Sequence, residues 1–143
     1  MNLSISESTN TNSLDRSVRP NRFEGLTILA VDDEADSLDI LTIVLEGEGA
    51  NVISATSATA ALEVFERTTP DVIVSDIGMP DIDGYILIEE IRKLPQARGI
   101  SAIALTAYGA EIDVRQSLNS GYQRHLAKPI DIPRLIATIT ELL

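Results

Sequence analysis

The stretch from Asp71 to Tyr85 constrains the fold more than any other part of the chain. It opens with the apolar run Val72-Ile73-Val74, which follows Pro70 and ends near Asp76. A short apolar run bounded by a turn former is typical of a strand buried on both faces. An acid at the carboxyl end of such a strand lies where open α/β sheets bind their ligands. An ordinary strand-end acid facing water would have the same sequence, so this stretch alone leaves both interpretations open.

The rest of the chain alternates strand-like and helix-like segments. We predict strands over residues 26–31, 51–55, 71–76, 100–105 and 123–127. We predict helices over about 35–47, after Ser57, after Asp83, over about 111–120, and after Asp131. Gly and Pro residues separate these segments, and the links are short. Five strand–helix units in this order predict an α/β fold, a doubly wound parallel sheet with helices on both faces.

Composition limits the possible classes of protein. With 143 residues, of which 44% are hydrophobic, the chain suits one domain with an aliphatic core, which we expect over 25–143 after a disordered polar tail at 1–24. The absence of Cys excludes disulfides and thiolate zinc sites. The net charge of −11 argues against direct nucleic acid binding. No apolar run has the length of a membrane span and no signal segment begins the chain, so we expect a cytoplasmic protein without a membrane partner.

Polar side chains follow the predicted strands at the same end. Asp32, Asp33 and Glu34 follow the first strand, and the others are Asp76, Thr106 and Lys128. In a parallel sheet these ends lie along one edge, so the side chains should converge there. Grouped carboxylates repel one another, and a Mg²⁺ ion relieves that repulsion through oxygen ligands. A hydroxyl and an ammonium group beside the ion suit phosphoryl oxygens, and an Asp can itself form an aspartyl phosphate. Glu34, the last acid of its run, is expected to cap the following helix or to add charge.

Residues 26–143 resemble the receiver domain of two-component response regulators. The matching segments are Val31-Asp32-Asp33-Glu34, Asp71 to Asp76 with Met79-Pro80 and Asp83-Gly84, Leu105-Thr106-Ala107, and Ala127-Lys128-Pro129-Ile130. Each segment is weak by itself, and their order and their placement at strand ends make the resemblance specific. The resemblance implies a flavodoxin-like sheet of five parallel strands in the order 2-1-3-4-5, for which a receiver protein is itself a known example.

The resemblance also implies roles for the residues of the acidic cluster. Asp76 corresponds to the phospho-acceptor. Asp33 resembles the direct Mg²⁺ ligand, and Asp32 resembles the second acid, which acts through water. The backbone carbonyl of Gly78 corresponds to the third protein ligand of the metal. Gly78 puts no side chain beside the acceptor, so we expect this position neither to assist nor to block hydrolysis.

Four further residues correspond to the switch. Thr106 resembles the hydroxyl group that moves toward the phosphoryl group, and Lys128 the cation that pairs with it, with a cis peptide bond to Pro129. His125 stands where receivers commonly carry Tyr or Phe, so the family pattern is broken there. It could act as a switch, could titrate, or could be an ordinary half-exposed strand residue. Tyr108 is a candidate for the missing aromatic switch residue.

The function implied is that of a phosphorelay receiver. A phosphohistidine of a histidine kinase or a histidine phosphotransfer protein would supply the phosphoryl group, and the domain would turn over no separate substrate. Similarity around residues 121–129 is greatest to receivers attached to hybrid histidine kinases. The chain could therefore be the C-terminal receiver of such a kinase or a free-standing regulator. A homodimer through the fourth helix, fifth strand and last helix is also possible.

Three alternatives remain open. A pseudo-receiver would use the same fold for partner binding without phosphorylation, against which the complete acid set argues. A phosphatase-like hydrolase with an Asp nucleophile would need an acid two residues after Asp76, where this chain has Gly78. A flavodoxin would need a phosphate-binding loop after the first strand, where Asp32, Asp33 and Glu34 would repel the FMN phosphate.

Overall fold

A computed structural model describes residues 21–80, 82–107 and 121–143 of the chain. The elements are, in order, β2 (Thr27–Val31), α1 (Ala35–Gly47), β3 (Asn51–Ala55), α2 (Ala58–Val64), β4 (Val72–Asp76), α3 (Gly84–Arg92), the 3₁₀ helix η1 (Pro95–Ala97), β5 (Ser101–Thr106), β6 (Arg124–Ala127) and α5 (Ile132–Leu142). The predicted strands and four of the predicted helices are thus confirmed within one or two residues. The helix predicted over about 111–120 lies outside the described residues.

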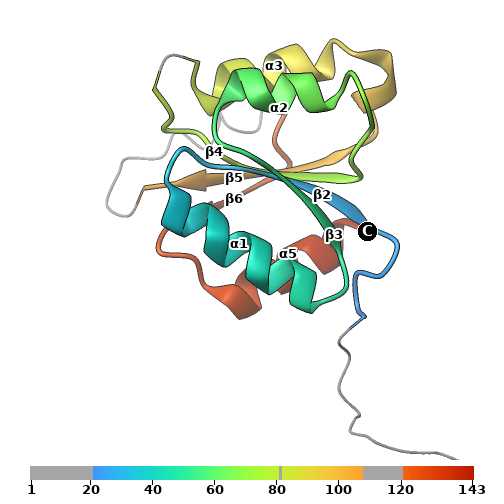
Figure 1. Ribbon diagram of the computed structural model, residues 1–143, viewed down its shortest axis with the longest axis vertical. Coiled ribbons are helices and arrows are strands. Elements are labelled where there is room, and N and C mark those ends of the chain that lie inside the picture. Colours follow the sequence, from blue (N-terminus) through green and yellow to red (C-terminus); the bar gives the residue numbers. More distant parts are fainter. Residues whose placement is uncertain (1–20, 81, 108–120) are drawn as a thin grey trace, which may run out of the picture.

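The sheet has five strands in the order β3-β2-β4-β5-β6, and every neighbouring pair is parallel. Numbered along the chain, this is the predicted order 2-1-3-4-5. Helices α1 and α5 lie on one face of the sheet, and α2 and α3 lie on the other (Figure 1). The order in which strands are added to the sheet reverses between β2 and β4, because β3 lies on one side of β2 and the later strands lie on the other. A doubly wound sheet opens a crevice at its carboxyl edge at this point.

Alternation along the central strands divides the core into two layers. Leu29 and Val31 of β2 belong to the layer under α2 and α3, together with Ile73 of β4. Ile28 and Ala30 belong to the layer under α1 and α5. Successive side chains of a strand point to opposite faces, so a strand that is covered on both faces favours an unbroken run of apolar residues. The run Val72-Ile73-Val74 has this pattern because β4 is buried along its whole length.

The helix starts follow from short polar side chains in the sequence. Ser57 Oγ accepts a hydrogen bond from the Ala60 amide at 3.0 Å, and Asp83 Oδ1 accepts one from the Ile86 amide at 3.0 Å. Asp131 Oδ1 accepts from the Arg134 amide at 3.1 Å. Such caps satisfy backbone donors that have no partner within the helix, and they lie at the three positions after which the sequence predicted that helices begin.

The folded region begins earlier than the predicted boundary at residue 25. Phe23 is 1% exposed and packs in the α1–α5 layer, and its amide donates to the Glu48 carbonyl at 2.7 Å. A single aromatic residue next to a polar stretch has no periodicity, so the sequence gives no sign that its ring is buried. In the part of the chain that the structure describes, no helix has the length and apolarity needed to cross a bilayer.

Candidate functional site: an acidic cluster at the carboxyl edge of the sheet

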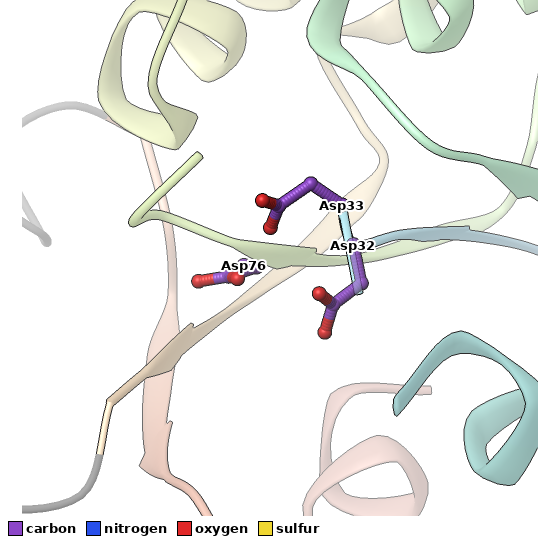
Figure 2. Close-up of side chains that lie close together, drawn as sticks. All are labelled: Asp32, Asp33 and Asp76. Atoms are coloured by element: carbon purple, nitrogen blue, oxygen red, sulfur yellow. The ribbon is translucent and has the colours of Figure 1, made fainter. Parts of the chain in front are cut away.

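The acidic cluster forms because β2 and β4 are neighbours in parallel register. Val31 pairs with Ser75, so Asp32, which directly follows β2, lies at the same level as Asp76, the last residue of β4. Carboxylate oxygens of Asp32, Asp33 and Asp76 lie within 4.8 Å of one another. Figure 2 shows the Asp32 and Asp33 side chains leaving their chain in different directions, with Asp76 beside them.

Backbone amides hold two of these carboxylates in place. Asp76 Oδ1 accepts a hydrogen bond from the Gly78 amide at 2.9 Å, and Asp32 Oδ1 accepts one from the Glu34 amide at 2.9 Å. Each of these acids therefore has one oxygen fixed by the chain that follows it, and its second oxygen remains for another partner. Asp32 and Asp76 are buried, at 0% and 6% exposure, whereas Asp33 faces the solvent.

Lys128 supplies the cation at this site. Lys128 directly follows β6, whose last residue, Ala127, pairs with Thr106 of β5. The Lys128 amide donates a hydrogen bond to the Thr106 carbonyl at 2.7 Å. The ammonium nitrogen lies 2.8 Å from Asp32 Oδ2 and 3.2 Å from Asp76 Oδ2. Burial alone would lower the pKa of Lys128, but the carboxylates of Asp32 and Asp76 outweigh it and raise that pKa above its usual value. The peptide bond from Lys128 to Pro129 is cis, as expected.

The donor set fits a hard divalent cation. Three carboxylates converge on a space where Lys128 supplies a single positive charge, which leaves an excess of negative charge. The buried Asp32 Oδ2 is paired with the Lys128 ammonium at 2.8 Å, and an anionic carboxylate oxygen with this one partner retains lone pairs for a metal ion. Burial raises the pKa of Asp32 despite the opposing effect of Lys128. Oxygen ligands and available water positions are what Mg²⁺ requires, so the cluster is consistent with Mg²⁺ binding.

Two glycines shape the loop after Asp76. A Cβ atom on Gly84 would lie 2.5 Å from the Ile77 Cα and 2.7 Å from the Asp76 carbonyl oxygen, so α3 can begin this close to β4 only with glycine there. A Cβ atom on Gly78 would lie 3.6 Å from Asp76 Oδ1, which is ordinary contact. A side chain at position 78 would therefore stand directly beside Asp76, and glycine leaves that approach open.

The remaining predicted residues lie at different distances from the cluster. Thr106 is 3% exposed, and its hydroxyl donates to the Leu126 carbonyl at 3.5 Å. His125 is half-buried on β6 and lines a pocket of about 330 Å³ together with Arg134 of α5. Tyr108 lies outside the described residues. The structure therefore brings Asp32, Asp33, Asp76 and Lys128 together. His125 lines a different pocket, beside Arg134.

The Glu34 side chain makes a contact that the amino-acid sequence does not reveal. Glu34 occupies the N-cap position of α1, but its side chain makes no capping hydrogen bond, so the capping part of the expectation was wrong and the added charge remains. Glu34 Oε1 instead lies 3.4 Å from the Lys128 ammonium and accepts a hydrogen bond from Ser37 Oγ at 3.4 Å. An acidic run gives no sign of which acid reaches a lysine ninety-four positions away.

Comparison with known proteins identifies the family. Residues 28–140 match the family model of the response regulator receiver domain. The chain belongs to this family. A 14.6 kDa protein of the sodA1 3′ region in Leptolyngbya boryana is 44% identical over 116 residues, which cover 81% of this chain and 88% of that protein. Receiver domains are signalling domains of two-component systems, and this chain is therefore a phosphorylatable receiver by family.

Solved receivers share its fold. A CheY-like receiver domain protein from Methanospirillum hungatei is 33% identical with a TM-score of 0.74, covering 81% of this chain and 91% of that chain. The receiver domain of a signal transduction histidine kinase from Syntrophus aciditrophicus is 32% identical with a TM-score of 0.74, covering 82% and 89%. Other curated relatives are longer regulators, of which this receiver spans 26% to 48%.

Proposed function

We propose that this receiver accepts a phosphoryl group on Asp76 in a Mg²⁺-dependent reaction, with a phosphohistidine of a histidine kinase or a histidine phosphotransfer protein as donor. A carboxylate oxygen of Asp76 attacks the phosphorus atom, the bond between phosphorus and the imidazole nitrogen breaks, and the imidazole takes the electron pair of that bond. The product is an acyl phosphate on Asp76. The observation that carries this proposal is the position of Asp76 at a strand end, beside two further acids and 3.2 Å from Lys128.

The chain's own residues would position and neutralise the reacting groups. Asp32, Asp33, Asp76 and the Gly78 carbonyl would hold Mg²⁺, which would supply charge neutralisation for the transferred phosphoryl oxygens. Asp76 Oδ1 is held by the Gly78 amide, so the carboxylate keeps a fixed orientation toward an incoming donor. The Lys128 ammonium already lies next to Asp76 Oδ2 and would donate to a phosphoryl oxygen without a large movement.

Phosphorylation would then change partner binding. An acyl phosphate adds negative charge and strong acceptors, for which the Lys128 ammonium and the Thr106 hydroxyl are suitable donors. The Thr106 hydroxyl now donates to the Leu126 carbonyl at 3.5 Å, a long bond that can be exchanged for a phosphoryl oxygen. Because Thr106 and Leu126 belong to β5 and β6, that exchange would alter the surface at this side of the sheet.

Intact mass measurement after incubation with acetyl phosphate and Mg²⁺ tests the proposal. We expect one added phosphoryl group on the wild type, and none without Mg²⁺ or in the Asp76→Asn variant. Asp71→Asn is the matched control, because Asp71 is an exposed acid at the opposite end of β4. A wild type that gains no phosphoryl group and also fails to bind beryllofluoride would contradict the proposal. It would favour a pseudo-receiver that binds partners without phosphorylation.

A further inference from the structure

The Lys128 ammonium contacts three carboxylates: those of Asp32 and Asp76 at the strand ends, and that of Glu34. Asp32 Oδ2 lies at 2.8 Å, Asp76 Oδ2 at 3.2 Å and Glu34 Oε1 at 3.4 Å. An ammonium group has three N–H donors, so the three carboxylates occupy its whole donor capacity. Phosphorylation turns the Asp76 contact itself toward the phosphoryl group, so a further hydrogen bond from Lys128 to that group requires that one of the other two partners be displaced.

We propose that Glu34 is this displaced partner, a positioning residue that competes with the phosphoryl group for the Lys128 ammonium. The inference rests on the proposed function of Asp76. In the unphosphorylated protein Glu34 occupies the third donor of Lys128, and on phosphorylation its carboxylate moves into solvent while the donor turns to a phosphoryl oxygen. Glu34 therefore weakens the phosphorylated state relative to the unphosphorylated one.

Burial and distance separate Glu34 from the other two acids. Its side chain is 67% exposed, whereas those of Asp32 and Asp76 are 0% and 9% exposed. A buried carboxylate that loses its cation is left uncompensated, whereas an exposed one regains water at little cost. Glu34 also has the longest of the three contacts with Lys128.

The surroundings give the Glu34 side chain room to leave. An open pocket of about 350 Å³ lies between α1 and the chain after β6, and it is lined by Glu34, Ser37, Ile40, Lys128, Pro129 and Ile130. Within the described residues, the only other hydrogen bond to Glu34 Oε1 comes from Ser37 Oγ at 3.4 Å, and it is weak. Glu34 is thus held loosely, on the open side of the cation.

Beryllofluoride, a phosphoryl mimic, tests the competition directly. We expect Glu34→Gln to bind beryllofluoride about threefold more tightly than the wild type at saturating Mg²⁺, because the loss of an exposed ion pair changes an equilibrium only modestly. Asp36→Asn is the matched control. It removes the same charge from the exposed first turn of α1 and should change the affinity by less than about 1.5-fold.

Each outcome bears on one of the two proposals. Equal affinities of Glu34→Gln and Asp36→Asn would show a general charge effect and overturn the competition. Weaker binding by Glu34→Gln would overturn it as well, because it would show that Glu34 holds Lys128 in its productive position. Failure of the wild type itself to bind beryllofluoride would instead overturn the proposed function on which the inference rests. Thermal unfolding of all three proteins, expected to agree closely, checks that the folds are intact.

Discussion

Two partly buried cationic side chains lie at opposite edges of the sheet and are neutralised in different ways. At the carboxyl edge, the Lys128 ammonium faces the carboxylates of Asp32, Asp76 and Glu34. At the amino edge, the Arg92 guanidinium lies among oxygen atoms that carry no formal charge. Under the proposed function, the fold uses one cation for chemistry at the carboxyl edge and another for structure at the amino edge.

Arg92 connects four segments that meet at the amino edge. Its Nη1 donates to the carbonyls of Ala97 at 3.0 Å and Ile100 at 2.9 Å, and its Nη2 donates to the Gly121 carbonyl at 2.8 Å. Nη2 also lies 3.3 Å from Gln123 Oε1, which accepts from the amide at the start of β5. Burial lowers the pKa of Arg92, and the fixed fork of a guanidinium suits several acceptors at once.

The two cations differ in whether their partners can be replaced. Backbone carbonyls cannot leave Arg92 without local unfolding, so this cation holds one arrangement. Lys128 has three carboxylate partners of unequal burial, and the exposed Glu34 is the one that we propose a phosphoryl group replaces. The comparison predicts that removing Arg92 affects stability and removing Lys128 affects phosphorylation.

Arg92→Met should have the largest effect on stability. We expect it to lower the free energy of unfolding by about 3 kcal/mol, because several partly buried carbonyls lose their donor. Its phosphorylation rate should stay within about twofold of the wild type, since the two edges are far apart. Urea unfolding and the acetyl phosphate assay measure these two quantities. Arg98→Met, at an exposed arginine, is the control, and comparable destabilisation in both variants would contradict the role of Arg92.

Lys128→Met should have the opposite effect to Arg92→Met, because it should slow phosphorylation more than it changes stability. We expect its phosphorylation rate by acetyl phosphate to fall about 100-fold, as is typical when one donor to a developing charge is removed. The rate is measured by intact mass against time at saturating Mg²⁺. Lys93→Met removes a lysine whose side chain is 70% exposed, and it should leave the rate unchanged. A Lys128→Met rate close to that of Lys93→Met would show that the ammonium is dispensable.

Mg²⁺ should stabilise the folded protein through the acids of the carboxyl edge. At about twenty times its Kd, Mg²⁺ should raise the free energy of unfolding by about 1.8 kcal/mol, because it binds the folded state alone. Asp33→Asn should abolish most of this rise, whereas Asp39→Asn, an exposed acid on α1, should retain it. Urea unfolding with Mg²⁺ or with a chelator measures the effect, and a rise that survives in Asp33→Asn would place the ion elsewhere.

A buried neutral donor extends the comparison. The Tyr122 hydroxyl donates to the Gly84 carbonyl at 2.8 Å, and burial raises the pKa of this phenol. The unfolded phenol ionises near pH of about 10, so this contribution to stability is complete below that pH and is lost as the pH rises further. Tyr122→Phe should lose about 1 kcal/mol at neutral pH, and its stability should approach that of the wild type in alkali. Parallel pH profiles for the two proteins would contradict this.

Much of the fold and of the cluster could be predicted because both depend on local patterns. Apolar runs such as Val72-Ile73-Val74 indicate buried strands, and parallel strands end at one edge, which brings Asp32 and Asp76 together. The structure confirms this convergence, because Val31 pairs with Ser75 and each of the two acids follows one of these residues.

What could not be predicted depends on tertiary contacts that leave no sequence pattern. Arg92 resembles an ordinary helix-end arginine, because its partners are backbone carbonyls, which every residue has. Phe23 lies beside a polar stretch, and the direction of its ring is decided by packing. The contact of Glu34 with Lys128 depends on the path of the chain after β6, which the acidic run does not reveal.

The most direct test of the central claim is to locate the phosphoryl group on the chain. Borohydride converts an aspartyl phosphate to homoserine, so peptide mass spectrometry of the phosphorylated and reduced protein identifies the acceptor. We predict homoserine at position 76 and at no other acid, and none in protein that was kept without Mg²⁺. Homoserine at Asp32, Asp33 or another acid, with Asp76 intact, would contradict this account.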